Sequence, residues 1–441
     1  MGGERRGRLI CGLLSRATRR CSGRRRVSKS GQKDKPFTIP KQLVWEAYKR
    51  VKANKGAAGV DRVSMEGFEE DLRGNLYKVW NRMSSGTYFP PPVKAVEIPK
   101  SHGGTRILGV PTVADRIAQT VVALQLEART ESIFHQDSYG YRPRKSAHDA
   151  LSKCRQRCWK NNWVVDLDIE KFFDSLDHNL VVRTVEANTG QKWVLLYVKR
   201  WLKTPLQMPD GTLQDRGRGT PQGSAVSPVL ANLFLHYAMD SWLEREFPSV
   251  EFERYADDAV LHCSTEYQAR KVRDALAERL EGLGLRLHPG KTKIVYCRDD
   301  NRRGSYEHVS FTFLGYEFRS RSAENRNGQL FTTFSPAISP DALKAKSQQL
   351  RGWRIHKRVG SDLADLAEWI NPVARGWMNY YGRFNRSRLY RLLQRINTYI
   401  VRWARNKYRR LGSFKKAKRW WAGLVDREPG LFVHWAWIST F

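Results

Sequence analysis

Two adjacent aspartates inside a strand-like sequence place the tightest constraint on this chain. Asp257 and Asp258 lie in the stretch 252–261, where apolar and strand-favouring residues flank them on both sides. Burying two neighbouring carboxylates is unfavourable unless a cation compensates their charge. Because side chains alternate between the faces of a straight strand, both acids reach one site only at a hairpin turn. Mg²⁺, which favours hard oxygen ligands, is the usual compensating ion.

A second acidic strand lies upstream. The stretch 163–174 opens as a strand, and its acids Asp166 and Asp168 share one face because they alternate. Two strands that each end in an aspartate can hold two metal ions about 4 Å apart, which clamps the attacking and leaving oxygens of a phosphoryl transfer. An isolated Asp-Asp pair is more often a turn or a solvated surface feature, so the interpretation depends on the intervening sequence. Asp166 stays outside the proposed metal-binding set.

From about residue 40 to 425 the chain resembles the reverse transcriptases encoded by group II introns. Tyr255-Ala256-Asp257-Asp258 resembles the catalytic turn of that family, and Asp168 fits its first catalytic strand. The stretch 219–228 resembles its template and nucleotide loop, and its Gly and Pro content predicts a loop. The resemblance implies an α+β, right-hand polymerase with fingers, a palm of antiparallel sheet plus helices, and a helical thumb or maturase domain.

The resemblance also implies the reaction, which is RNA-templated addition of deoxynucleotides to a primer 3′-hydroxyl. Two Mg²⁺ ions would be held by Asp168, Ile169, Asp257 and Asp258. Lys291 is the candidate general acid near the leaving pyrophosphate, with Lys293 as the alternative. The implied partners are the parent group II intron RNA, an RNA template with a DNA primer, and deoxynucleoside triphosphates.

Further site residues follow from the same resemblance. The expected nucleotide-binding residues are Lys100, Arg106, Arg116, Phe173 and Gln222. For the first two, which flank a Gly-Gly turn, the alternative is a surface hairpin with solvated cations; for Gln222 it is a plain Pro-Gln-Gly turn. Phe173 would lie beneath the nucleotide sugar and discriminate against a 2′-hydroxyl. The alternative is that Phe172 or Phe173 only anchors the strand in the core, so that one ring would serve each purpose.

Primer and RNA contacts complete the expected site. The expected primer grip consists of Phe313, Leu314, Gly315 and Tyr316, and a buried hydrophobic hairpin is the alternative. Interleaved basic and aromatic residues suit backbone contacts combined with base stacking. The expected RNA- or DNA-binding residues are Arg142, Lys145, Arg388, Arg395, Arg402, Arg405, Lys415 and Lys416.

The charge balance indicates a polyanionic partner. The chain has 78 Lys and Arg against 44 Asp and Glu, a net charge of +34, which folding alone does not require. Residues 1–35 carry a net charge of +10, which predicts a disordered RNA-binding arm; a mitochondrial transit peptide is the alternative. Residues 341–441 carry +16 and 8 of the 15 Trp, which predicts an amphipathic bundle that also contacts nucleic acid.

Cysteine and apolar patterns indicate the compartment. The six cysteines are scattered, and Cys154 and Cys158 have no second pair or nearby ligand histidine, so reduced thiols rather than zinc are expected. No apolar run approaches 18 residues, so no membrane span is expected. We predict a bacterial cytoplasmic protein, with a mitochondrial location as the alternative. The oligomeric state is left open.

The expected domain order runs from arm to thumb. The segments are 1–36, a basic arm; 37–160, an N-terminal extension and fingers; 161–320, the palm; 321–340, a linker; 341–425, the thumb or maturase domain; and 426–441, a C-terminal tail. Within the thumb, residues 342–370 should be helical, and Asn371-Pro372 should end that helix. No Cys-rich, His-Asn-His type nuclease domain is visible, so we expect no second-strand cleavage.

Two alternative functions stay open. One is an RNA-binding splicing factor that keeps only the polymerase fold, although the three acids argue against a purely structural survivor. The other is a related polymerase used in antiphage defence or spacer acquisition. A fused integrase or nuclease would favour this second alternative, and none is visible.

Overall fold

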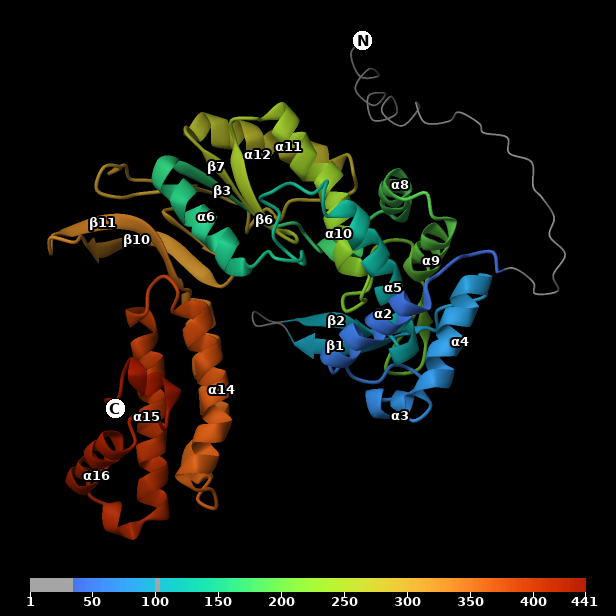
Figure 1. The fold of residues 1–441 in the computed structure, drawn as a ribbon. Coiled ribbons are helices and arrows are strands. Elements are labelled where there is room, and N and C mark those ends of the chain that lie inside the picture. Colours follow the sequence, from blue (N-terminus) through green and yellow to red (C-terminus); the bar gives the residue numbers. More distant parts are fainter. Residues whose placement is uncertain (1–34, 100–103) are drawn as a thin grey trace, which may run out of the picture. The chain divides into compact units, whose positions relative to one another are not determined.

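The computed structural model describes residues 35–99 and 104–441, which form two units (Figure 1). The first contains the described residues up to Phe134, together with 171–238 and 283–285. The second contains 135–170, 239–282 and 286–441. The expected arm falls almost wholly outside the described residues, as does Lys100. The expected segment boundaries stay a prediction.

The first unit combines helices with one small sheet. Its helices are α2 (Lys41–Ala53), α3 (Met65–Glu69), α4 (Leu72–Ser85), α5 (Val113–Thr130), α7 (Phe172–Ser175), α8 (His178–Asn188), α9 (Lys192–Leu202) and α10 (Ser227–Leu235). Its strands are β1 (Val93–Pro99), β2 (Thr105–Val110), β4 (Leu206–Gln207) and β5 (Leu213–Gln214), in the order β2-β1-β4-β5. Strands β1 and β2 are antiparallel, so that Ile98 pairs with Arg106.

Helix α5 forms the centre of this unit. Thr112 caps its start by accepting a hydrogen bond from the Asp115 main-chain nitrogen. Apolar residues such as Ile117, Val121 and Val122 are fully buried, and α2 and α4 pack against the helix. The helix therefore gives the neighbouring loops a rigid support.

The second unit contains two sheets and a set of long helices. Its strands are β3 (Trp163–Leu167), β6 (Glu251–Tyr255), β7 (Asp258–Cys263), β8 (Lys293–Tyr296), β9 (Ser310–Phe313), β10 (Tyr316–Glu324) and β11 (Leu330–Ile338). Its helices are α6 (Ala147–Lys160), α11 (Ser241–Glu246), α12 (Glu266–Glu281), α13 (Pro340–Gly352), α14 (Leu363–Tyr381), α15 (Ser387–Lys407) and α16 (Phe414–Arg427). The π-helical segment His236–Asp240 precedes α11.

The larger sheet of the second unit has the strand order β6-β7-β3-β8, and all its pairs are antiparallel. Val164 of β3 and Val260 of β7 lie in one buried cluster with Leu151 and Cys154 of α6. Helix α12 also packs against β3 and β7. Buried β-branched side chains thus fix the register of β3 and β7, and the register positions the acids that end or begin these strands.

The helical region after β11 differs from the expectation at two points. Residues 342–370 do not form one helix, because α13 ends at Gly352 and α14 begins at Leu363. Helix α14 runs from Leu363 to Tyr381 and contains Pro372, so the predicted break at Asn371-Pro372 is wrong. Asn371 instead holds the C-terminal segment, because its amide donates to the Leu431 carbonyl oxygen and accepts from the Val433 main-chain nitrogen. Packing of the buried face of α14 outweighs the loss of one main-chain hydrogen bond at proline.

Helix α15 separates its apolar and basic residues cleanly. Leu389, Leu393, Ile396 and Ile400 are fully buried, in one cluster with Phe432 and Trp435 of the C-terminal segment. The exposed arginines occupy the opposite stripe of the helix, since their spacing of three, four or seven residues keeps them on one face. They are Arg388, Arg391, Arg395, Arg402 and Arg405. The α+β class and the helical thumb are thereby confirmed.

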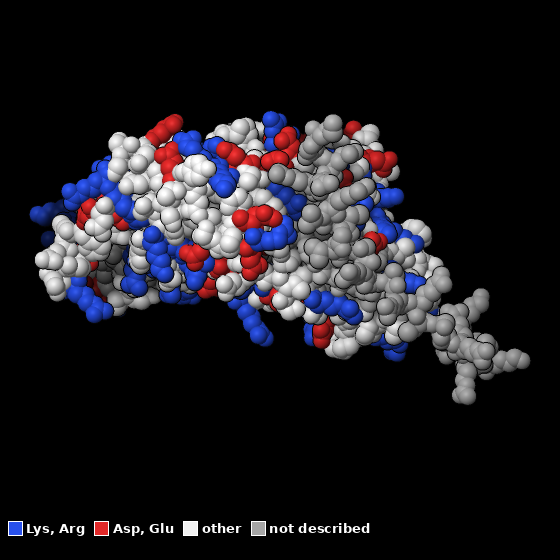
Figure 2. Space-filling view, turned by 90° about the horizontal axis from the view of Figure 1, so that it is seen from above, with Lys and Arg blue, Asp and Glu red and all other residues white. Residues whose placement is uncertain are grey.

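Lys and Arg are also prominent on the face shown in Figure 2, where they are interspersed with fewer acidic groups. No helix within residues 35–99 and 104–441 is both long enough and apolar enough to cross a bilayer.

Candidate active site

The β6–β7 hairpin presents Asp257 and Asp258 at a two-residue turn. Tyr255 pairs with Asp258 across the hairpin, so Ala256 and Asp257 form the turn itself, and the predicted hairpin is confirmed. Ala256 adopts a left-handed φ of 58°, an uncommon conformation for a residue with a side chain. The main chain of Gly140 lies against this turn: a Cβ atom there would be 2.4 Å from the Ala256 nitrogen. Only glycine permits this approach.

Strand β3 brings Asp168 to the same end of the sheet. The β3–β7 ladder pairs Leu167 with Ala259, so continuing the register by one residue sets Asp168 opposite Asp258. Asp166 pairs with Val260 of β7 and with Lys293 of β8. Asp166 of β3, Asp168 just after it and Asp258 of β7 therefore lie near the same end of the sheet, although the two strands are far apart in the sequence.

The electrostatics of these acids favour a divalent cation. Burial raises the pKa of Asp258 well above its usual value, and the charges of Asp166, Asp257 and Asp168 raise it further, while the Leu314 amide opposes them. Burial likewise raises the pKa of Asp166 to about 7, which Lys293 opposes and Asp168 reinforces. Crowded carboxylate oxygens in a partly buried site match the ligand preference of Mg²⁺. The residues present thus fit the metal that the sequence suggests.

Lys291 contacts the first aspartate. Its Nζ atom lies 3.0 Å from Oδ2 of Asp168. The preceding loop is fastened to β3, since the His288 main-chain nitrogen donates to the Asp168 carbonyl oxygen at 2.7 Å and Ile169 bridges Leu287. Lys293, the alternative, instead pairs with Asp166 in the sheet. Geometry therefore favours Lys291 over Lys293 as the cation nearest Asp168.

Sequence reasoning missed a buried ion pair beneath the turn. The fully buried Arg254 donates from Nε and Nη2 to the two carboxylate oxygens of Asp240, at 2.7 and 2.6 Å. Its Nη1 donates to the Ala256 carbonyl oxygen at 2.9 Å. This bidentate pair holds the strained turn in place. The only sequence signal was an arginine in a short strand that alternates acidic and aromatic residues.

The four expected primer-grip residues form the turn between β9 and β10. The side chains of Phe313 and Tyr316 are fully buried, as the alternative predicted, whereas Leu314 and Gly315 are partly exposed and have positive φ angles of 51° and 77°. The Leu314 carbonyl oxygen accepts a hydrogen bond from the Tyr380 hydroxyl of α14 at 2.9 Å, and the Tyr316 hydroxyl donates to the Tyr380 carbonyl oxygen. The two central turn residues, rather than the aromatic rings, are partly exposed here.

In the first unit, the loop 219–223 is fastened to α7. The Thr220 main-chain nitrogen donates to the Phe173 carbonyl oxygen at 2.7 Å. The Gln222 carbonyl oxygen accepts from the Gly109 main-chain nitrogen, also at 2.7 Å. Phe172 is buried while Phe173 is partly exposed, and the nucleotide contact expected of Phe173 stays a prediction.

A buried polar network under this loop was not anticipated. Asp115 accepts hydrogen bonds from the Tyr88 hydroxyl, the Trp201 indole and the Gln119 amide, each at 2.8 Å. Gln119 in turn accepts from Ser224 and from the Ala225 main-chain nitrogen at 2.7 Å. Burial raises the pKa of Asp115 to about 6 despite these donors. The network ties the loop to α5.

Two of the expected cationic residues in this unit have different environments. Arg106 is exposed on β2, where its side chain is accessible to a ligand. Arg116 instead donates to the Ala57 carbonyl oxygen at 2.7 Å, and burial lowers its pKa. Arg116 thus closes the loop after α2, a structural role beside the expected one.

Two basic residues of the 135–145 loop bond to that loop's own carbonyl oxygens. Arg142 donates to His135 and Ser138 at 2.6 and 2.7 Å. Lys145 donates to Gln136 at 2.6 Å and lies over the Tyr139 ring.

The expected thumb cations are exposed on the α15 stripe and on α16. Arg405 donates to the Gly412 carbonyl oxygen at 2.7 Å, and beside it Arg402, Arg405, Asn406 and Gly412 line a hollow of about 280 Å³. In the part of the chain that the structure describes, this is the one side-chain hydrogen bond or ion pair of the stripe arginines, and Arg402 also lies over the Tyr399 ring. The stripe therefore leaves its cations available for phosphate contacts.

A buried cluster in the second unit has metal-ligand chemistry but is already saturated. The ligand atoms of Cys154, Glu253 and His262 lie within 4.8 Å of one another. The Glu253 carboxylate accepts from Arg157 at 2.5 Å and from the His262 ring at 2.6 Å. Burial lowers the pKa of His262, but the Glu253 charge prevails and raises it to about 10. The cluster is therefore a closed ion-pair network of the core.

Known proteins resemble this chain over most of its length. Residues 98–318 match the family model described as reverse transcriptase (RNA-dependent DNA polymerase), and residues 343–421 match the group II intron, maturase-specific domain. Protein YkfC of Escherichia coli is 30% identical over 335 residues, which cover 66% of this chain and 84% of that protein.

Two further matches cover less of the partner protein or are more remote. The group II intron-encoded protein LtrA of Lactococcus lactis is 31% identical over 222 residues, which cover 48% of this chain and 36% of LtrA. This chain thus matches about a third of the length of LtrA. A solved structure of telomerase from Candida albicans with a telomeric RNA fragment has a TM-score of 0.44 and 13% identity, and covers 86% of this chain and 69% of that one.

The reverse transcriptase match covers β3, the β6–β7 hairpin and the loop at 219–223, and the second match covers α14 and α15 in full. The match to the reverse transcriptase family confirms the RNA-directed DNA polymerase function expected from the sequence. The chain belongs to the reverse transcriptases and carries the maturase-specific domain of group II introns.

Proposed function

We propose that this protein copies RNA into DNA at Asp168, Asp257 and Asp258, and that it binds its parent group II intron RNA to assist splicing and mobility. The observation that carries the proposal is the convergence of these three acids at one end of the β6-β7-β3-β8 sheet. There the charges of Asp168 and Asp257 raise the pKa of Asp258. Charge crowding of this kind is typical of a site that handles divalent cations and phosphates.

The residues have distinct roles in this proposal. Asp168, the Ile169 main chain, Asp257 and Asp258 would hold two Mg²⁺ ions, which when bound would activate the primer hydroxyl and neutralise the triphosphate. Lys291, in contact with Asp168, would supply a proton to the leaving pyrophosphate. The Leu314-Gly315 turn would support the primer end.

Nucleotide selection is assigned to the first unit. Arg106 would contact the triphosphate, and Phe173 would lie against the sugar, where a 2′-hydroxyl would clash with the ring. The main-chain bonds from Phe173 to Thr220 and from Gln222 to Gly109 support this proposal, because they hold these groups in a defined arrangement. Lys100 completes the proposed set from outside the described residues, and Arg116 supports it from α5.

RNA binding is assigned chiefly to the α15 stripe and α16, whose exposed cations suit phosphate contacts. The relatives include a bacterial intron-encoded protein, which supports an intron RNA as the partner. A bacterial cytoplasmic location stays a prediction.

Primer extension on an RNA template tests the proposal. The wild-type protein should add deoxynucleotides with Mg²⁺ and stop when EDTA is added. Asp168→Ala should abolish extension and leave RNA affinity in a filter-binding assay within about twofold. Glu251→Ala, which removes an exposed acid of the same sheet, serves as the matched control. Extension by the Asp168 variant would refute the assignment of the site.

A further inference from the structure

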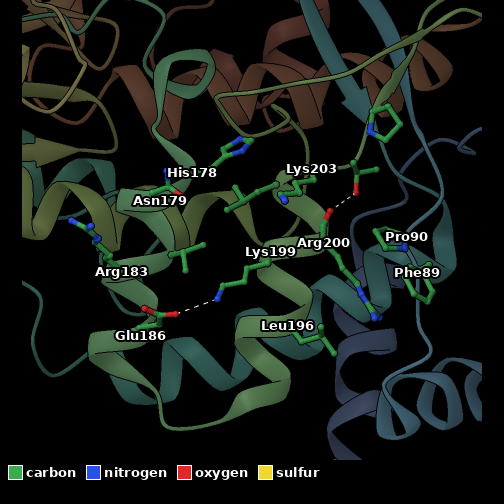
Figure 3. A pocket seen from close by; sticks show the side chains of 14 residues that line it. Phe89, Pro90, His178, Asn179, Arg183, Glu186, Leu196, Lys199, Arg200 and Lys203 are labelled. Carbon is green, nitrogen blue, oxygen red and sulfur yellow. Dashed lines mark hydrogen bonds and ion pairs between the residues drawn. The ribbon is translucent and has the colours of Figure 1, made fainter. Parts of the chain in front are cut away.

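A cationic pocket in the first unit has no role in the reaction proposed above. It lies between α8 and α9 and is closed by the segments around Phe89 and Thr204, with a volume of about 710 Å³ (Figure 3). None of its lining residues belongs to the proposed catalytic or nucleotide-binding set. A pocket of this size accommodates a small ligand or a single nucleotide.

The charges around the pocket are unbalanced. Arg183, Lys199, Arg200 and Lys203 line it, against one acid, Glu186. Glu186 pairs with Lys199 at 3.3 Å, as the dashed line in Figure 3 shows. The Arg183 and Lys203 side chains are exposed, and within residues 35–99 and 104–441 neither has a hydrogen bond or ion pair with another residue. Two unneutralised cations at one pocket point to an anionic ligand.

An exposed aromatic ring stands at the pocket edge. The Phe89 side chain is 69% exposed, which is unusual for a phenylalanine. The Arg200 guanidinium lies 3.8 Å from the centre of this ring and donates to the main-chain carbonyl oxygens of Gly86 and Tyr88. These contacts fix one face of the ring and leave the side chain open for stacking. Aromatic rings of this kind bind unpaired bases.

We propose that this pocket holds an unpaired nucleotide of a folded RNA. Arg183 and Lys203 would contact its phosphates, Phe89 would stack on its base, and the apolar floor, which includes Val182 and Leu196, would contact the sugar and base edge. The inference rests on the proposed function only in that the protein binds RNA. An acidic peptide would satisfy the cations but would offer no planar base to Phe89, so the chemistry favours RNA.

The site can be mapped by crosslinking on the full chain. A 12-nucleotide single-stranded RNA that contains 4-thiouridine is irradiated with the protein, and the adducts are located by mass spectrometry. We expect adducts in the peptides that contain Phe89 or residues 178–203. Their suppression by an excess of unlabelled single-stranded RNA, but not by poly-glutamate of equal charge, would support the proposal.

Charge variants test the phosphate contacts. Arg183→Gln/Lys203→Gln should reduce the slope of log affinity against log salt by about 1.4, because each phosphate contact to a single strand contributes about 0.7. The double variant Arg129→Gln/Lys192→Gln, which removes two exposed cations of α5 and α9 outside the pocket, is the matched control and should retain the pocket adducts.

Aromatic variants test the stacking contact. Phe89→Ala should weaken binding of the single-stranded RNA about fivefold or more and remove the adduct at residue 89, since stacking contributes about 1–3 kcal/mol per base. Phe89→Trp should restore binding, and Tyr267→Ala, at another exposed ring, should have no effect. A blunt RNA duplex should bind wild type and Phe89→Ala equally.

The outcomes separate this inference from the polymerase proposal. Each pocket variant should extend a primer on saturating template at the wild-type rate, with an unchanged melting temperature. Absence of pocket adducts, an unchanged salt slope in the charge variant, or equal competition by poly-glutamate would overturn the pocket assignment while leaving primer extension intact. Conversely, Asp168→Ala should lose primer extension and still form the same RNA adducts at the pocket.

Discussion

The Nζ atom of Lys291 lies 3.0 Å from Oδ2 of Asp168, although the two residues are far apart in the sequence. The contact is possible because the loop before β8 bonds to the end of β3 through His288 and Thr292. Both side chains remain substantially exposed, at 63% and 40%. An exposed ion pair contributes little to stability, so its position at the acidic cluster matters more for chemistry than for folding.

Lys291→Ala should therefore reduce the rate of nucleotide addition with little effect on stability. General acid catalysis contributes about 10²–10⁴-fold in enzymes, which sets the expected loss in single-turnover incorporation. Lys293→Ala should cost much less in rate, because Lys293 pairs with Asp166 within the sheet. An equal loss in both variants would indicate that overall positive charge, rather than a proton donor at Lys291, accounts for the effect.

Gly219 should tolerate no side chain. Its φ is +79°, and an added Cβ atom would lie 2.7 Å from the carbonyl oxygens of Phe173 and Asp174. Gly219→Ala should displace the loop from Phe173, raise the KM for deoxynucleotides and cost roughly 1–3 kcal/mol of stability. Steady-state incorporation and urea denaturation measure the two effects.

Gly217→Ala is the matched control for this prediction, since an added Cβ atom there would meet nothing within 4 Å. It should leave both KM and stability near the wild-type values. If Gly219→Ala behaved like Gly217→Ala, the contact between the loop and α7 would not matter for nucleotide binding.

Local sequence patterns predicted the hairpin, the acidic strands and the loop, because these depend on alternation, turn residues and charge. The supporting network could not be predicted in the same way. Asp240 reaches Arg254 from a π-helical segment, and Asp115 accepts hydrogen bonds from Tyr88 of the loop before β1 and from Trp201 of α9. Such partners are fixed by tertiary packing. The failed helix end at Pro372 has the same origin, since a buried face outweighed a local rule.

The Arg254–Asp240 pair should be essential for the catalytic turn. Both side chains are fully buried, so Asp240→Asn leaves a buried cation without its counter-charge. We expect a loss of about 3–5 kcal/mol of unfolding free energy. Partial unfolding of the turn should also reduce primer extension at temperatures where the remaining fold persists.

Chemical denaturation followed by tryptophan fluorescence measures this loss. Glu246→Gln, which removes the acid of an exposed pair with Arg245 at 2.9 Å, is the control and should change stability by less than about 1 kcal/mol. Comparable values for the two variants would contradict a supporting role for the buried pair.

The C-terminal segment should loosen in acid through His434. This ring is fully buried and hydrogen-bonds Asn397 Oδ1 through Nε2 at 2.6 Å, and burial lowers its pKa to about 3. Because the folded-state pKa lies below the unfolded value of about 6.5, the unfolded state takes up the proton first. Stability is therefore complete above pH 6.5 and falls as the pH drops toward 3, by roughly 2 kcal/mol between pH 6.5 and 5.

Hydrogen exchange of the amides at 432–438, corrected for the intrinsic rate, measures this loss between pH 5 and 7. His434→Gln removes the titrating group while keeping a side-chain donor for Asn397, so its protection should vary less with pH than that of the wild type. His308→Gln, at a partly exposed histidine, should retain the wild-type dependence. Since Asn397 also binds the carbonyl oxygens of Ile438 and Thr440, an equal pH dependence in His434→Gln would assign the acid sensitivity to another group in this segment.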